Sequence, residues 1–220
     1  PVTYSLVSSP TQGLLSGTLP NLTYTPLESY VGSDSFTFKV NDGTADSLTA
    51  TVSITINPIL TNGSFESVTG TSPNLIPTDW TITSSSALAA AYEIKGSPTP
   101  QDGARIAAFN TGGRAPNAIF TQTFETTPGR PYILRFSLGI HTFDTNSRQQ
   151  VMGVTLSGIT STPPANQTIT RAGLATGTFA WETKEIEFTA GAATTTLQLR
   201  DVSLTGASGA VDMLLDKVSV

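Results

Sequence analysis

Residues 132–138 read Tyr-Ile-Leu-Arg-Phe-Ser-Leu, and this stretch decides the fold class of the chain. The large apolar side chains fall at every second position: Tyr132, Leu134, Phe136 and Leu138. They share one face of an extended strand, while Arg135 and Ser137 face the other way. A strand with one apolar and one polar face packs on a core through one side only, which predicts an antiparallel sheet.

The same alternation recurs through the second part of the chain. We predict eight strands there: 80–83, 104–109, 118–125, 131–139, 149–157, 179–189, 194–200 and 211–220. No segment between them is a convincing helix. Eight strands without a helix predict a jelly-roll β-sandwich over residues 59–220.

Residues 1–58 contain shorter strands joined by turns. The alternating stretches are 3–7, 21–26, 34–40 and 51–56, and Asn41-Asp42-Gly43-Thr44 is a hairpin signal. The chain is therefore predicted to be all-β, with a boundary after residue 58. Because it begins inside a strand pattern, we expect it to be a fragment of a longer protein.

Composition restricts the function classes. Charged residues make up only 12%, there is no cysteine, and the net charge is −5 with 11 basic residues. These values argue against nucleic-acid binding, and no apolar run reaches membrane-spanning length. Without cysteine, a disulfide framework or a Cys-ligated zinc site is excluded. A Thr-rich and Ser-rich β protein of this kind indicates a secreted or cell-surface location in a bacterium.

Several motifs in the first 58 residues form a recognisable set. They are Tyr4-Ser5-Leu6-Val7, Tyr24-Thr25-Pro26, Gly32-Ser33-Asp34-Ser35-Phe36-Thr37-Phe38, Val40-Asn41-Asp42-Gly43 and Ala50-Thr51-Val52-Ser53-Ile54. This segment resembles the cadherin-like, Ig-like repeats of bacterial surface proteins, which normally have further strands before these. The resemblance implies an incomplete Ig-like sandwich with an exposed edge. A preceding segment, a neighbouring domain or a strand donated by another chain would complete it, the last giving self-association.

Residues 59–220 carry a second ordered set of motifs. They include Asn62-Gly63-Ser64-Phe65-Glu66, Ile76-Pro77-Thr78-Asp79-Trp80, Gln101-Asp102-Gly103-Ala104-Arg105-Ile106-Ala107, Thr127-Pro128-Gly129-Arg130-Pro131-Tyr132 and Leu215-Asp216-Lys217-Val218-Ser219-Val220. This part resembles the galactose-binding-like jelly rolls, in particular the DUF642 and choice-of-anchor group and carbohydrate-binding modules of families 4, 9 and 22. The resemblance strengthens the fold prediction and leaves the ligand open.

Two acidic motifs bracket this second part, one ending in Glu66 and the other containing Asp216. The first and last strands of a sandwich often lie side by side, and carboxylate oxygens are ligands for calcium. The family resemblance implies a structural Ca²⁺ held by Glu66 and Asp216, with Asp102 as a third ligand. The alternative is that these are surface acids satisfied by Lys217 or by water.

Strand parity places polar side chains on the outer sheet surface. Arg135 and Arg200 alternate with core residues, as do Gln198 and Glu187, and we interpret them as one surface that hydrogen-bonds sugar hydroxyls. Cross-strand ion pairs are the alternative.

The loop after residue 139 is the stronger ligand candidate. It contains the only histidine together with an aromatic ring, an amide and a guanidinium: His141, Phe143, Asn146 and Arg148. A ring flanked by planar polar groups suits carbohydrate recognition. The alternative is a polar loop with Phe143 packed at the margin of the core. A second such loop holds Arg114 and Asn117. Both tryptophans, Trp80 and Trp181, are assigned to the core rather than to a sugar platform.

Catalysis is not expected. His141, Asp144 and Ser147 are the residue types of a hydrolytic triad, but they lie within one polar loop and no Gly-x-Ser-x-Gly elbow occurs. The sequence predicts a non-catalytic extracellular adhesion protein whose jelly roll binds a glycan or a neighbouring surface protein. The alternative is a structural subunit of a surface layer or filament, assembled by strand donation and without a glycan ligand.

Overall fold

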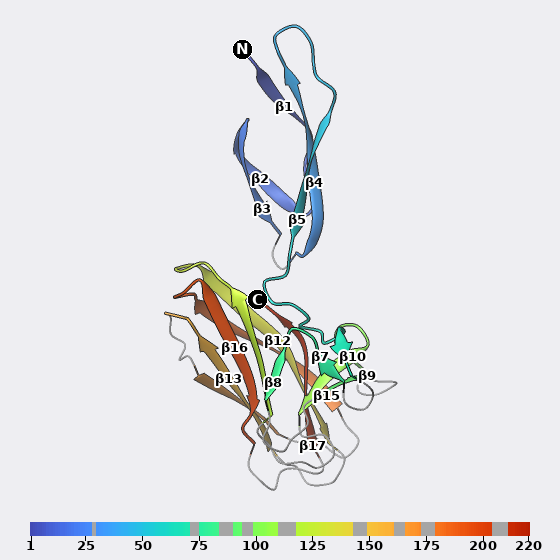
Figure 1. Cartoon of the computed structure of the whole chain (residues 1–220), viewed down its shortest axis with the longest axis vertical. Coiled ribbons are helices and arrows are strands. Elements are labelled where there is room, and N and C mark those ends of the chain that lie inside the picture. The colour runs from blue at the N-terminus through green and yellow to red at the C-terminus, as the bar shows by residue number, and fades with distance from the viewer. Residues whose placement is uncertain are drawn as a thin grey trace. The chain divides into compact units, whose positions relative to one another are not determined.

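The computed structural model describes most of the 220-residue chain, and its strands form two compact units, Pro1–Pro58 and Ile59–Val220 (Figure 1). The described residues are 1–27, 30–70, 75–83, 90–93, 99–109, 118–142, 149–160, 166–172, 179–203 and 211–220. Regular structure in these ranges is entirely β-strand, which confirms the all-β prediction. No helix in them is long and apolar enough to cross a membrane.

The described residues of the first unit form five strands: β1 (Thr3–Ser8), β2 (Gly13–Thr18), β3 (Asn21–Pro26), β4 (Gly32–Asn41) and β5 (Ala50–Ile56). Strands β1, β4 and β5 form an antiparallel sheet in the order β1-β4-β5, and β2 pairs with β3 as a separate hairpin. Sequence reasoning missed β2, because its two glycines and adjacent leucines do not alternate.

Asp34 fastens the β2–β3 hairpin to β4. Its carboxylate accepts hydrogen bonds from the backbone N–H groups of Thr11 (3.0 Å) and Gln12 (2.9 Å) and from the Tyr24 hydroxyl (2.9 Å). Desolvation acts to raise the pKa of Asp34, but these bonds and one from Ser35 hold it below its ordinary value. Desolvation, and then the bond to Asp34, raise the pKa of Tyr24 to about 12.

The described residues of the first unit do not enclose a hydrophobic core. Among its described residues, no apolar side chain is buried, and several large ones are exposed: Val2, Tyr4, Leu6, Val7, Leu14, Leu19, Leu27, Val31 and Leu48. Tyr4 and Leu6 pair with Val40 and Phe38 across the β1–β4 ladder, so they extend one apolar sheet face. The described strands of this unit therefore form one sheet and one hairpin with an exposed apolar face.

The described residues of the second unit form twelve strands. They are β6 (Val68–Thr69), β7 (Ile76–Pro77), β8 (Thr81–Thr83), β9 (Ala90–Glu93), β10 (Arg105–Phe109), β11 (Ile119–Glu125), β12 (Pro131–Thr142), β13 (Gln149–Ser157), β14 (Asn166–Ala172), β15 (Phe179–Thr189), β16 (Thr194–Asp201) and β17 (Val211–Ser219). Two five-stranded sheets result: sheet I, in the order β15-β12-β17-β10-β9, and sheet II, in the order β14-β13-β16-β11-β8.

The pairing of the last eight strands defines a jelly roll. Strand β13 pairs with β14, β12 with β15, β11 with β16 and β10 with β17, all antiparallel. These pairs make one long hairpin centred between β13 and β14. Rolling it up adds the β12–β17 and β13–β16 ladders and closes the two sheets. The jelly-roll prediction is confirmed.

The core lies between the sheets, where the parity of the sequence places it. Sheet I contributes Leu134, Phe136 and Leu138, and sheet II contributes Leu197 and Leu199, all fully buried. All eight predicted strands are present, within a few residues at each end. Strand β14 was not predicted, because Ile169 is the only large apolar side chain in Asn166–Ala172.

Candidate functional site

The two acidic motifs of the second unit bind one segment, residues 99–105, through its backbone. Asp216 lies in β17 and is fully buried. Its Oδ2 accepts hydrogen bonds from the N–H groups of Gln101 (2.7 Å) and Asp102 (3.1 Å), and its Oδ1 accepts one from Lys217 (2.7 Å). Lys217 has a positive φ of 54°, where β17 bulges against β12. Both oxygens of Asp216 are therefore occupied by amides.

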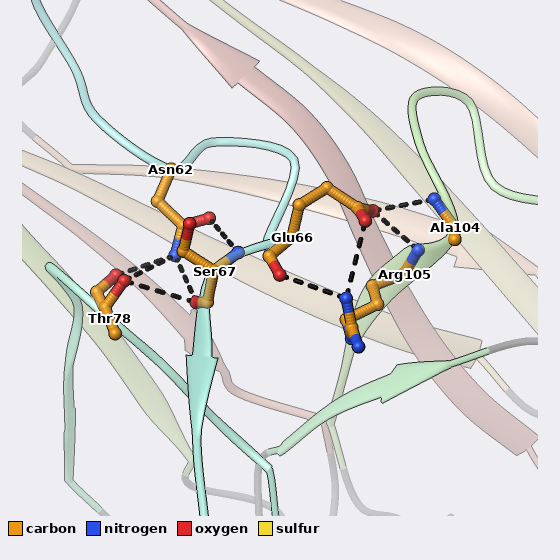
Figure 2. Close-up of polar contacts among 6 residues, drawn as sticks. All are labelled: Asn62, Glu66, Ser67, Thr78, Ala104 and Arg105. Atoms are coloured by element: carbon orange, nitrogen blue, oxygen red, sulfur yellow. Dashed lines mark hydrogen bonds and ion pairs between the residues drawn. The ribbon is translucent and has the colours of Figure 1, made fainter.

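Glu66 binds the other end of the same segment (Figure 2). Its Oε1 accepts hydrogen bonds from the N–H groups of Ala104 (2.8 Å) and Arg105 (2.6 Å). The Arg105 guanidinium donates to the Glu66 carbonyl (3.0 Å) and lies 3.6 Å from Oε2. Gly103 is required here, because its φ is +67° and a Cβ atom would lie 2.4 Å from Cδ of Glu66. We call Glu66, Asp216 and residues 99–105 the clasp.

A tight turn positions Glu66. The Asn62 side chain donates to the carbonyls of Ser67 and Thr78 (2.8 Å each) and accepts from the Ser67 N–H (Figure 2). The carbonyl of Gly63 accepts from the Val218 N–H at 2.9 Å. A side chain at Gly63 would collide with the Val218 carbonyl, so only glycine permits this approach. The Asn62–Glu66 motif is thus fixed beside the C-terminal strand.

The carboxylates of the clasp bind N–H groups in this structure. Calcium requires several converging oxygen ligands, whereas these carboxylates face N–H donors and one guanidinium. The side chain of Asp102 is exposed, and this residue contributes its N–H group instead. Among the described residues, no three His, Cys, Asp or Glu side chains form a group that could hold a metal. Calcium binding by Glu66, Asp216 and Asp102 stays a prediction that chelation can test.

A second feature is an aromatic cluster on the outer face of sheet I. Phe179 and Trp181 lie on β15 with a ring-centroid distance of 5.2 Å and an interplanar angle of 89°. Strand pairing places His141 opposite Phe179 and Gly139 opposite Trp181. A Cβ atom at Gly139 would lie 2.8 Å from Trp181, so the indole rests directly on the strand backbone. The side chains of Phe179, Trp181 and His141 are partly exposed.

Apolar residues of other strands of sheet I pack against these rings. Ile106 and Ala108 of β10 and Leu214 of β17 form a small cluster against Phe179 and Trp181, separate from the main core. The Trp181 Nε1–H donates a hydrogen bond of 2.8 Å to the Thr99 carbonyl. The indole is therefore held from below by the sheet and at its edge by the 99–105 segment. We call Phe179, Trp181 and His141 the aromatic face.

The aromatic face corrects the assignment of Trp181 to the core. Trp80 is buried at 6% exposure and donates to the Asn62 carbonyl, as expected for a core residue. Trp181 instead lies outside the sandwich. The parity of β15 contained this information, because Phe188 points inward and Trp181 is seven positions away. The core assignment of Trp181 followed the family motif instead of the alternation of β15, and it placed the side chain on the wrong face of the sheet.

The predicted surface combining Arg135 and Arg200 is wrong. Arg135 lies on β12 in sheet I, whereas Arg200 lies on β16 in sheet II. The outer faces of the two sheets of a sandwich point in opposite directions, so these guanidinium groups cannot contact one ligand. Arg135 donates to Glu185 of β15 at 2.8 Å, the cross-strand ion pair given as the alternative.

The remaining loop candidates fall outside the described residues: Phe143, Asn146, Arg148, Arg114 and Asn117. His141, the last candidate of that group, lies in β12 on the same face as Trp181. Partial burial lowers the pKa of His141, which favours its neutral form at neutral pH.

A buried polar cluster at one end of sheet II was not anticipated. The Ser203 N–H donates to Asp201 Oδ1 at 2.9 Å, and the Ser203 hydroxyl donates to Gln150 Oε1 at 2.8 Å. Asp201 and Gln150 are fully buried. The other oxygen of Asp201, Oδ2, has no hydrogen-bond partner, so a buried carboxylate is only half satisfied.

The first unit has a family match. Residues 1–55 match the model of the bacterial Ig domain. This match confirms the Ig-like prediction for Pro1–Pro58. Among curated proteins, no sequence matches the chain.

Solved structures similar to the chain include carbohydrate-binding modules, as the resemblance predicted. A family 61 module in complex with β-1,4-galactotriose is 13% identical over 74% of this chain and 97% of its own, with a TM-score of 0.49. A family 4 module is 16% identical over 73% and 98%, with a TM-score of 0.40. The K1 adhesin domain of Lys-gingipain from Porphyromonas gingivalis W83 is 14% identical over 70% and 93%, with a TM-score of 0.44.

Proposed function

We propose that the second unit is a non-catalytic glycan-binding module of an extracellular adhesion protein, and that the glycan binds at the aromatic face. The observation that carries this proposal is the partly exposed Phe179–Trp181 pair on the outside of sheet I. Large aromatic side chains of a soluble protein are mostly buried, and an exposed pair on a sheet is characteristic of a binding surface. The apolar face of a pyranose ring stacks on such a ring.

Polar groups that suit sugar hydroxyls continue along the same strand. Thr183, Glu185 and Glu187 follow Trp181 at every second position of β15, and all three are exposed. Arg135 adds a guanidinium beside Glu185. An aromatic contact followed by carboxylate and hydroxyl groups matches the alternating apolar and polar surface of an oligosaccharide. The face offers stacking and hydrogen bonding, which accounts for binding without catalysis.

A glycan array with three proteins tests the proposal. We expect the native protein to bind a defined set of glycans, and Phe179→Ala to lose that binding. Arg200→Ala is the matched control, because Arg200 is an exposed side chain on the opposite sheet. Equal loss of binding in both variants would contradict the aromatic face as the site. Binding to a surface protein but to no glycan would contradict the ligand class.

A second candidate function concerns the first unit. Its apolar sheet face, with no buried apolar side chain among the described residues of 1–58, favours a structural subunit in which a neighbouring copy donates a strand. We expect light scattering to show a mass that rises with concentration in this case. A monomer at all concentrations, with residues 1–58 stably folded, would contradict it.

A further inference from the structure

We propose that the clasp positions the aromatic face: Glu66 and Asp216 hold the 99–105 segment, and this segment fixes the orientation of Trp181. The inference rests on the proposed function in one respect, that Trp181 contacts the ligand. Glu66 and Asp216 are then positioning residues for a binding site they do not touch.

The first step is the hold on the segment. Five consecutive positions contribute four N–H groups, two to Asp216 (Gln101 and Asp102) and two to Glu66 (Ala104 and Arg105). Hydrogen bonds to carboxylates are among the strong ones in proteins. Gly103, between the two pairs, has the positive φ that lets the chain turn from one carboxylate to the other. The segment is anchored at both ends of this turn.

The second step is the short length of chain between Gln101, which Asp216 holds, and Thr99, which binds Trp181. Thr99 lies two residues before Gln101, and its carbonyl accepts the Trp181 indole N–H at 2.8 Å. Two residues span at most about 7 Å of extended chain, so Thr99 cannot move far while Asp216 holds Gln101. The hydrogen bond to Thr99 in turn fixes the indole edge, and Gly139 fixes the plane beneath it. Displacing the segment therefore releases one of the two restraints on Trp181.

This coupling gives the clasp a role that requires no metal. The amides of Gln101 and Asp102 bind Oδ2 of Asp216, and those of Ala104 and Arg105 bind Oε1 of Glu66, so the clasp is held by N–H donors. Both chain ends of the module, near Glu66 and near Asp216, are thereby linked to the ligand face through one short segment. Any change that weakens the clasp is expected to alter ligand affinity as well as stability.

Indole N–H exchange tests the proposal on the full chain. The protein has two tryptophans, so a ¹H–¹⁵N spectrum has two indole signals, and Trp181→Phe identifies them. We expect Asp216→Asn to accelerate exchange of the Trp181 indole N–H about tenfold or more, since its acceptor Thr99 becomes mobile. Glu66→Gln provides a milder variant if Asp216→Asn does not fold.

Leu156→Ala is the matched control, because it removes a buried core side chain on β13 of sheet II, whereas Trp181 lies on β15 of sheet I. It should lower the melting temperature and leave Trp181 exchange unchanged at temperatures well below the transition. Unchanged Trp181 exchange in both clasp variants would overturn the coupling. The readout needs no glycan, so an absence of glycan binding would refute the proposed function and leave this result interpretable.

Discussion

The sharpest prediction concerns the pH dependence of stability through Asp216. Burial raises the pKa of this carboxyl from 3.8 to about 6, against the lowering effect of the amides of Asp102, Gln101 and Lys217. The folded state therefore keeps its proton at pH values where the unfolded state has released it. Such a group contributes stability that is fully present below the unfolded pKa and is lost as the pH rises through about 6.

The size of the stability change follows from the difference between the pKa values of Asp216 in the unfolded and folded states. A change from 3.8 to about 6 is roughly two pKa units, and one unit corresponds to about 1.4 kcal/mol, giving about 3 kcal/mol in all. Asp216→Asn removes the titration. We therefore expect the difference in unfolding free energy between native protein and Asp216→Asn to fall by about 2–3 kcal/mol between pH 4 and pH 7.5. Other titrating groups cancel in this difference.

Urea denaturation followed by tryptophan fluorescence is the assay. Both tryptophans lie in Ile59–Val220, so the signal reports the unfolding of the second unit alone. The measurement is made in chelator and again in excess calcium. A difference that rises with pH, and does so only with calcium, would refute the reasoning and support the calcium prediction, because a metal ligand must be ionised.

Three further predictions come from single contacts. Gly139→Ala places a Cβ atom 2.8 Å from Trp181, so the indole must move, and we expect a shifted Trp181 emission maximum with little change in global stability. An unshifted spectrum would contradict the packing. Asp201→Asn neutralises a buried carboxylate with an unpartnered oxygen and is expected to raise the unfolding free energy in urea titrations, whereas a lower unfolding free energy would indicate that this oxygen has a partner. Asp34→Ala removes both acceptor oxygens of the amides that precede β2, and hydrogen exchange at Thr11 should accelerate while β5 amides stay unaffected. Equal acceleration throughout the first unit would indicate global unfolding instead.

The sequence predicted the fold well because strand parity is local. Leu134 and Phe136, or Leu197 and Leu199, alternate with polar residues whatever their partners are, so their burial needed no knowledge of pairing. Strand β14 was missed because an edge strand contacts the core on little of its length, and Ile169 alone does not make a pattern.

The site was harder to predict because it depends on pairing. Parity places Arg135 and Arg200 outward, but only the strand order reveals that they belong to different sheets. The sequence placed Glu66 and Asp216 beside the loop that contains Asp102, as the hydrogen bonds show. No sequence signal tells whether these carboxylates bind backbone N–H groups or a metal ion. The hydrogen bond between Trp181 and Thr99 joins residues 82 positions apart and has no local signature.

The central claim is that Trp181 contacts the ligand, and the emission of the two tryptophans during a glycan titration tests it most directly. Trp80 is buried in the core and serves as an internal reference. We predict that a glycan identified on the array changes the emission of the native protein with saturation, and that the change disappears in Trp181→Phe. Saturable glycan binding by calorimetry with no change in emission would contradict the claim.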